Sequence, residues 1–206
     1  MSIITDAQPA PEDAGRQADA LDRADMEKLQ AGQDAALNDL MERHATPVFH
    51  FLCRMTGNED DANDLAQETF VRVFKSSGSF RPEQKFSSWL FTIAANLARN
   101  HFRWRARHPN VSLDAENPET EQSLGGTLPA DGPAPNEAAL AAERAQAVRV
   151  AVGKLPEDLR EAIVLCEWEN RSTAEAATIL ETTPKAVESR LYRARQVLRE
   201  RLKAWL

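Results

Sequence analysis

The sequence predicts an all-α fold of two small helical domains joined by a flexible acidic linker. Apolar residues recur every three or four positions, and no segment shows the alternation or the β-branched runs typical of strands. Charge is also segregated along the 206 residues: the net charge is −7, but residues 1–35 and 108–138 carry −11 together, which leaves +4 for the rest. Both acidic stretches are poor in large apolar residues, and the second is rich in Pro and Gly. Neither stretch can bury enough surface to offset the entropy lost on ordering.

This composition divides the chain into four parts. Residues 1–35, with 8 acids and 3 bases, are expected to form a disordered acidic tail. Residues 36–107 and 139–206 form the two compact domains. Residues 108–138, with 6 acids and no Lys or Arg, form the flexible linker between them.

Several function classes are disfavoured. No apolar run approaches the roughly 18 residues that cross a bilayer, and the N-terminus has no signal-peptide pattern, so a cytoplasmic protein without membrane insertion is expected. Cys53 and Cys166 lie far apart in apolar stretches, as buried free thiols do, and the 4 histidines lack metal-ligand spacing. Without a phosphate-binding glycine loop, nucleophile elbow or metal set, neither catalysis nor a cofactor is expected.

The first domain begins with two predicted helices. Residues 36–54 form a helix bent near Pro47, and residues 60–75 form a second helix capped by Asn58. The buried side of the first is expected to hold Leu37, Leu40, Met41, Val48, Phe51 and Leu52, and that of the second Ala62, Leu65, Ala66, Phe70, Val73 and Phe74. The second helix also carries an outward polar strip of Asp61, Asp64, Gln67 and Glu68, which taken alone is most simply a solvated face.

A third helix is predicted over residues 86–107. Its apolar stripe, expected in the core, holds Trp89, Ile93, Leu97 and Trp104, and an adjacent face holds Asn96, Arg99, Asn100 and Arg103. Residues 84–113 contain no acid. A basic and aromatic segment in an acidic protein favours contact with nucleic acid, because guanidinium groups bind phosphates and aromatic planes stack on bases. The alternative is a basic helix end that complements the helix dipole.

The sequence of the second domain predicts a helix-turn-helix. Leu155-Pro156 opens one helix, Ser172 and Glu175 form a capping box for a short helix, and Pro184 begins the last helix after a tight turn. Residues 185–203 hold seven bases and two acids. Val187, Leu191, Ala194, Leu198 and Leu202 form its apolar stripe, and Lys185, Ser189, Tyr192, Arg193 and Gln196 point away from that stripe, toward a DNA major groove. Arg190 lies beside the stripe, which suits a phosphate contact or an internal ion pair.

Taken together, residues 64–74, 86–100 and 187–195 resemble regions 2.2, 2.3–2.4 and 4.2 of bacterial RNA polymerase sigma factors of the extracytoplasmic-function (ECF) group. The resemblance implies a promoter-specificity subunit with sigma region 2 over residues 36–107 and region 4 over residues 139–206. The implied partners are core RNA polymerase, through its β′ clamp helices and β flap, promoter DNA and an anti-sigma factor, with a stress or envelope regulon.

The resemblance also assigns the site residues. The polymerase contacts are Asp61, Asp64, Gln67 and Glu68. The −10 element is contacted by Lys85, Phe86, Ser88, Asn96, Arg99, Asn100 and Arg103. The −35 element is contacted by Lys185, Ser189, Arg190, Tyr192 and Arg193.

The chain departs from the family pattern in its second domain. Glu181 and Lys185 stand where the family usually carries Gly, and Glu188 where it carries a base, which leaves the preferred −35 sequence open. Two alternatives also stay open: a sigma-like mimic that sequesters an anti-sigma protein, and a helix-turn-helix repressor that acts without polymerase. The mimic needs no basic cluster at residues 99–107, and the repressor leaves the aromatic and basic first domain unexplained.

Overall fold

The computed structural model of the chain describes residues 11–108 and 135–205, which form helices and their connections. The eight α-helices of this part of the chain are α1 (Pro11–Gln30), α2 (Ala36–Thr56), α3 (Glu59–Lys75), α4 (Phe86–Arg107), α5 (Pro135–Gly153), α6 (Glu157–Ile163), α7 (Thr173–Ile179) and α8 (Pro184–Arg201). Short helical segments follow α3 (η1, Ser77–Ser79), α6 (η2, a π-helical segment, Val164–Trp168) and α8 (η3, Lys203–Trp205). The all-α prediction is confirmed for the described residues.

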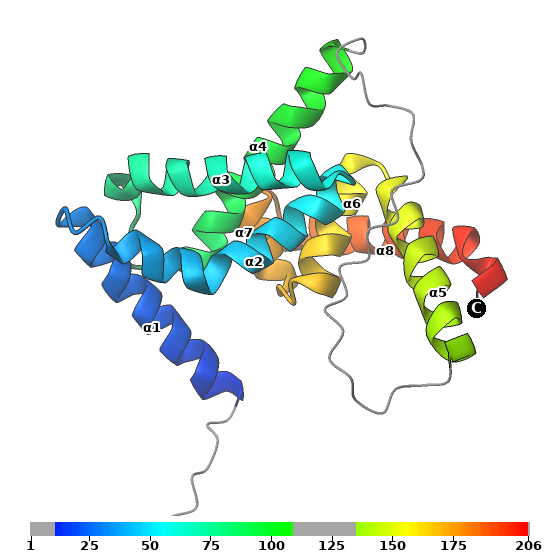
Figure 1. Cartoon of the computed structure of the whole chain (residues 1–206), viewed down its shortest axis with the longest axis horizontal. Coiled ribbons are helices and arrows are strands. Elements are labelled where there is room, and N and C mark those ends of the chain that lie inside the picture. The colour runs from blue at the N-terminus through cyan, green and yellow to red at the C-terminus, as the bar shows by residue number, and fades with distance from the viewer. Residues whose placement is uncertain (1–10, 109–134, 206) are drawn as a thin grey trace, which may run out of the picture.

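Helices α1–α4 form the first lobe (Figure 1). Its core is built from residues that recur at helical spacing, and Phe51 of α2 meets Phe91 of α4 edge to face with ring centroids 5.3 Å apart. Leu40, Leu52 and Leu90 are fully buried beside them. Pro47 lies inside α2, and Gly57, with φ of 71°, ends that helix in the left-handed conformation that favours glycine. Asn58 then caps α3 by accepting the Asp61 backbone N–H at 2.8 Å.

Helix α1 corrects the expectation of a disordered tail over residues 1–35. Residues 11–30 are helical, and Met26 and Leu29 are buried against the rest of the lobe. Two of the acids that suggested disorder are buried as well: Asp22 lies 2.9 Å from Arg43 Nε and Asp25 lies 2.6 Å from Arg43 Nη2. The balance of charges along residues 1–35 did not predict this helix, because Arg43, which neutralises Asp22 and Asp25, belongs to α2. Residues 1–10 lie outside the described part of the chain.

The second lobe contains α5–α8, and its helix-turn-helix forms as predicted. Ser172 accepts the Glu175 backbone N–H and Glu175 accepts the Ser172 backbone N–H, which completes the capping box before α7. Thr183 caps α8 by accepting the Ala186 N–H, with Pro184 in the first turn. Glu181 in the turn has φ of 52°, a left-handed conformation that glycine adopts more readily. The Gly that the resemblance implies at this position would suit this backbone conformation, which Glu181 adopts in this chain.

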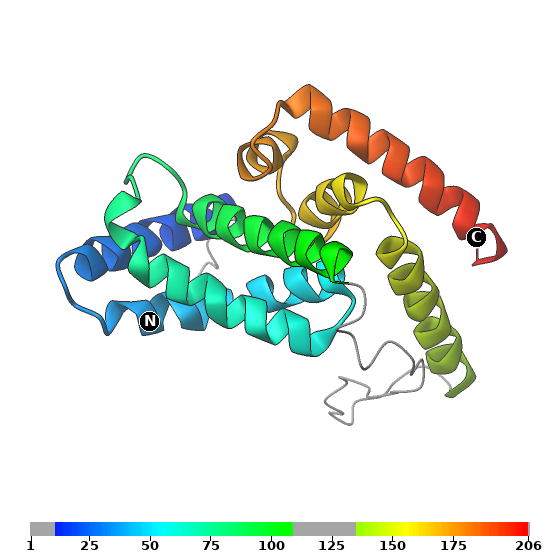
Figure 2. The ribbon, with the colours of Figure 1, turned by 90° about the horizontal axis from the view of Figure 1, so that it is seen from above.

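The two lobes lie side by side (Figure 2), and their buried apolar residues form one continuous core. Helix α7 lies against α4, and Leu90 of the first lobe belongs to the same buried cluster as Leu165 and Ile179 of the second. Most of the predicted linker, residues 109–134, lies outside the described residues. The second lobe begins at Pro135 with α5, four residues before the predicted boundary.

Three residues that the helical periodicity places in the core are exposed. Met41, Phe74 and Trp104 keep 37%, 43% and 44% of their surface accessible. Each lies at the edge of an apolar stripe, where spacing alone does not decide burial. Trp89 is half-buried, with its ring 5.3 Å from that of Phe80 and 6.1 Å from that of Phe86.

This difference between two tryptophans of α4 gives a stability prediction. Trp89→Ala removes a ring packed on two phenylalanines and should lower the free energy of unfolding by about 3 kcal/mol. Trp104→Ala removes an exposed ring and should cost less than about 1 kcal/mol. Urea unfolding followed by circular dichroism measures both values. Equal losses for the two variants would contradict this assignment of the core.

Candidate polymerase and nucleic-acid interfaces

The polar strip of α3 faces outward, and its members differ in how free they are. Asp64 and Gln67 are exposed. Glu68 accepts a hydrogen bond from Arg72 Nε at 2.8 Å, one turn further along α3, and both side chains are close to half-exposed. Exposed pairs of this kind contribute little to stability. Asp64, Gln67 and Glu68 therefore remain available to a partner.

Asp61, the first member of the strip, is tied to α4. Its Oδ2 lies 3.1 Å from Arg105 Nη1 and 3.3 Å from His101 Nε2. Its side chain is 29% exposed, against 44% for Arg105. Asp61 thus joins the N-terminal half of α3 to the C-terminal half of α4. The sequence placed it with Asp64 and Glu68 because their spacing is helical, but this cross-helix pairing depends on tertiary packing.

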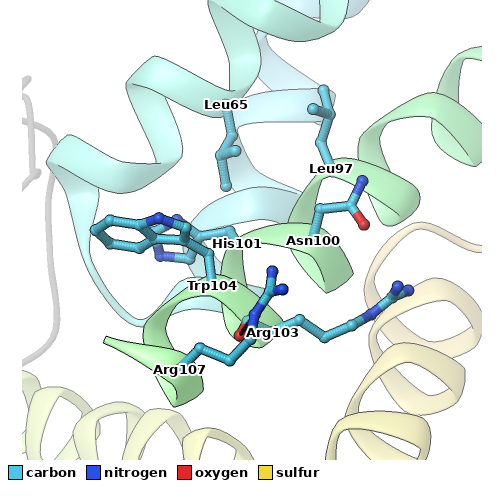
Figure 3. Close-up of a pocket in the computed structure, with 7 residues that line it drawn as sticks. All are labelled: Leu65, Leu97, Asn100, His101, Arg103, Trp104 and Arg107. Carbon is cyan, nitrogen blue, oxygen red and sulfur yellow. Dashed lines mark hydrogen bonds between the residues drawn. The ribbon is translucent and has the colours of Figure 1, made fainter. Parts of the chain in front are cut away.

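A groove of about 410 Å³ lies beside this contact, between α3 and α4 (Figure 3). Leu65 and Leu97 supply apolar walls, and Arg103 and Arg107 are basic residues of its lining. Trp104 also lines the groove, and its ring stacks on His108 at 4.9 Å with an angle of 26° between the planes. Trp104, which was predicted to lie in the core, is therefore a surface residue beside two arginines.

Two of the residues assigned to −10 contacts are buried in this structure. Phe86 is 2% exposed and packs edge to face on His44 at 5.2 Å. Ser88 is 7% exposed, and its backbone carbonyl accepts a hydrogen bond from Thr92. Both residues lie in the first turn of α4, which is buried against the core. Phe86 is thus a packing residue here, and its ring presents no surface on which a base could stack.

Two basic residues of the same assignment pair with acids of the second lobe. Lys85 Nζ lies 2.9 Å from Glu175 Oε1, and Arg99 makes contacts of 2.6 and 3.1 Å to the two carboxylate oxygens of Glu161. Burial raises the pKa of Glu161, and Arg99 partly opposes this rise. Burial also acts to raise the pKa of Glu175, but hydrogen bonds from Lys85 and Ser172 outweigh it and lower the pKa to about 2.

The remaining −10 candidates on α4 are Asn96, Asn100 and Arg103. Asn100 and Arg103 are exposed, and Asn96 is half-buried and accepts a hydrogen bond from Arg99 Nη1 at 2.9 Å. Asn96, Arg99, Asn100 and Arg103 therefore lie along one side of α4, as the sequence predicts. The structure divides this side into a part covered by the second lobe and a part open to solvent.

The outward side of α8 carries the predicted −35 residues. Lys185, Ser189, Tyr192 and Arg193 are all exposed, and Tyr192 keeps 66% of its surface accessible. Val187, Leu191 and Ala194 are buried on the opposite side. Arg190 is 25% exposed at its side chain and lies 3.8 Å from Asp158 of α6, so its guanidinium faces the rest of the domain.

Sequence reasoning missed the second-lobe residues that reach into the first. Arg160 donates to the Met55 carbonyl oxygen and lies 5.5 Å from the Phe102 ring centroid. Arg171 donates to Ser87 Oγ at 3.0 Å and lies 4.7 Å from the Phe91 ring centroid. One available signal was Glu161, a charged residue directly beside the apolar stripe of α6, since a buried acid requires a partner.

Residues 11–108 and 135–205 provide neither a membrane span nor a metal cluster. Within these ranges, no helix combines the length and apolarity that a bilayer crossing requires. The same residues bring together no group of three potential metal ligands from His, Cys, Asp and Glu.

Comparison with known proteins identifies both lobes. Residues 40–108 match Sigma-70 region 2, and residues 145–198 match Sigma-70, region 4. The RNA polymerase sigma-H factor of Pseudomonas aeruginosa is 32% identical over 88% of this chain and 93% of its own length. The ECF RNA polymerase sigma factor SigW of Bacillus subtilis is 32% identical, covering 86% of this chain and 95% of SigW.

Solved structures agree with this match. CnrH, in complex with the cytosolic domain of CnrY, has a TM-score of 0.65 at 29% identity, covering 89% of this chain and 98% of CnrH. The sigma factor RpoE of Bartonella quintana, in complex with the anti-sigma factor NepR, has a TM-score of 0.63 at 26% identity, covering 81% of this chain and 96% of that one. The chain therefore belongs to the sigma-70 family, as a member of the ECF group of RNA polymerase sigma factors that direct transcription initiation.

Proposed function

We propose that this sigma factor binds core RNA polymerase through the polar strip of α3, opens the −10 element with α4 and reads the −35 element with α8. It acts in the cytoplasm as a specificity subunit and performs no catalysis of its own. Its polymerase partners are the β′ clamp helices for the first lobe and the β flap for the second. The strip residues in this role are Asp61, Asp64, Gln67 and Glu68.

The observation that carries this proposal is the separation of charge onto different helices. An acidic strip lies on α3, whereas α4 and α8 present basic faces within a chain of net charge −7. A basic face in an acidic protein attracts phosphates locally, while the acidic strip suits a protein partner. A repressor that reads duplex DNA uses the face of α8 alone and gives no role to α3 and α4.

The assignment of α4 to the −10 element rests on its mixture of amide and guanidinium groups. Strand separation exposes bases that must be held unstacked at a cost of a few kcal/mol. Asn96 and Asn100 supply amides for base edges, and Lys85, Arg99 and Arg103 supply cations for the backbone. Phe86 and Ser88 belong to the supporting first turn of α4, given their burial.

The assignment of α8 to the −35 element rests on its geometry in the helix-turn-helix. The second helix of this motif enters the major groove, where arginine can contact a guanine with two hydrogen bonds. Ser189, Tyr192 and Arg193 are exposed on α8, and the mostly exposed Arg193 side chain lies 3.9 Å from Asp158 of α6 at the edge of this surface. Lys185 is exposed with this group, whereas Arg190 is turned toward Asp158 of α6, where contact with the DNA backbone is favoured over contact with bases.

A comparison of two arginines tests this assignment. Arg193→Ala should change the preferred −35 sequence, because a contact to a base edge is worth about 1–3 kcal/mol of discrimination. Arg199→Ala, on the last turns of α8, should weaken all promoters to a similar extent. Transcription by the holoenzyme from a library of −35 mutants gives both profiles. If the two variants lose activity identically across the library, Arg193 does not read bases.

An anti-sigma factor is the remaining proposed partner, in a stress or envelope regulon. The support is that the sigma factor RpoE of Bartonella quintana, to which this chain is similar, was solved with a bound anti-sigma factor, and CnrH with the cytosolic domain of CnrY. Co-purification of the tagged chain from its own cells, followed by mass spectrometry, identifies such a protein. The sigma-like mimic is disfavoured because the relatives that cover this chain are themselves sigma factors.

A further inference from the structure

The second lobe makes charged contacts with the first lobe from Lys85, just before α4, to Arg99, beyond the middle of that helix. Arg99 of α4 forms a two-pronged pair with Glu161 of α6, at 2.6 and 3.1 Å. Lys85, which precedes α4, lies 2.9 Å from Glu175 of α7 and 3.7 Å from Asp19 of α1. Both interlobe pairs join a cation of the first lobe to an acid of the second.

The Arg99–Glu161 pair is buried. The Arg99 side chain is 17% exposed and the Glu161 side chain is 4% exposed. Neutralising one partner of a buried charge pair strongly destabilises the contact that contains it, because the other charge stays desolvated and unpaired. This pair therefore makes the contact between the lobes sensitive to a single side chain.

Two further arginines extend the same interface. Arg171, just before α7, donates to Ser87 Oγ at 3.0 Å and covers Phe91. Arg54 of α2 lies 3.3 Å from Glu169 of the second lobe. Through Arg171, the second lobe thus also covers the first turns of α4, where Ser87 is buried.

We propose that Glu161 and Glu175 form an intramolecular latch that takes the place of promoter phosphates on Arg99 and Lys85, so that the free chain is closed against single-stranded DNA. This inference rests on the proposed role of α4 at the −10 element. A carboxylate with two oxygens on a guanidinium occupies the donor geometry that a phosphate would use. The latch and the nucleic-acid backbone therefore compete for the same two cations.

The latch covers only part of the proposed DNA surface. Asn100 and Arg103 remain exposed beyond its edge. The free chain should consequently retain weak binding through these residues and through α8. Full affinity requires the lobes to separate, which binding of both lobes to polymerase would favour.

The test uses the double variant Glu161→Gln/Glu175→Gln in the full chain. Glutamine keeps the size of both side chains, and its amide oxygen at position 175 still offers an acceptor for the capping box. The matched control is Glu27→Gln/Glu143→Gln, which removes the same charge from two exposed positions. Fluorescence anisotropy with a labelled oligothymidylate strand measures binding, and hydrogen exchange of α4, α6 and α7 measures separation of the lobes. Thermal unfolding verifies that each variant is folded.

The latch variant should bind the strand about tenfold more tightly than wild type and than the control, with faster exchange at the interface. Adding Arg99→Gln to the latch variant should remove most of that gain. Unchanged exchange in a folded latch variant would show that the two acids do not hold the lobes together. Faster exchange without tighter binding would instead show that the uncovered face is not a DNA surface, which overturns both the latch and the −10 assignment of these cations.

Discussion

Asn96→Ala combined with Arg103→Ala should reduce open-complex formation on a duplex promoter by more than about tenfold while leaving polymerase binding intact. The two changes remove the half-buried amide of Asn96, which accepts a hydrogen bond from Arg99, and the exposed cation of Arg103 from the proposed −10 face of α4. Contacts of this kind are worth about 1–3 kcal/mol each, and about 1.4 kcal/mol corresponds to a tenfold change. Neither side chain lies in the fully buried core of the first lobe, so the fold should persist.

Permanganate footprinting of the duplex template measures this loss as reduced reactivity of the −10 thymines. A template already mismatched at the −10 region should partly restore activity, because strand separation is then no longer required. The matched control is Asn38→Ala with Arg23→Ala, which truncates exposed residues of the same types on α2 and α1. Unchanged thymine reactivity in the α4 variant would show that this face does not drive strand separation.

Charge reversal on α3 should have an effect of similar size on holoenzyme assembly. Asp64→Lys with Glu68→Lys changes the charge of the exposed strip by four units and places a cation near Arg72, the present partner of Glu68. Charges at such an interface set encounter and register, so binding to core polymerase should weaken by about tenfold or more.

Co-purification with core polymerase at several salt concentrations measures this effect. Glu27→Lys with Glu143→Lys provides a control with the same change of net charge at exposed positions on α1 and α5. If the α3 variant co-purifies as well as wild type and the control, the strip is a solvated face and the polymerase docks elsewhere.

The sequence predicted the elements whose signals are local. Asn58, Ser172 and Thr183 cap the helices that follow them. Each side chain accepts the backbone N–H of the residue three positions later. The apolar stripe of α8 is likewise buried where its spacing placed it. Local hydrogen bonding and helical periodicity can both be read without knowledge of the tertiary fold.

The features that were missed depend on residues distant in sequence. Asp22 and Asp25 are ordered because Arg43 lies between them, and Arg99 is covered because Glu161, 62 residues away, packs against it. Phe86 has an aromatic ring of the kind that can stack on a base, but this ring is buried in the core at the start of α4. In each case a neighbouring element decides whether a side chain is paired, buried or free, and the sequence does not specify that neighbour.

Run-off transcription with purified core polymerase tests whether this chain initiates transcription and whether α4 opens the promoter. The template carries a promoter selected by the holoenzyme from a random library, and the chain is added as wild type or as the Asn96→Ala/Arg103→Ala variant. On the duplex template we expect a transcript only when core polymerase and the wild-type chain are both present. On a template mismatched at −10 we expect the variant to recover activity. Equal transcription by wild type and variant on the duplex template, or no dependence of the transcript on the added chain, would contradict these expectations.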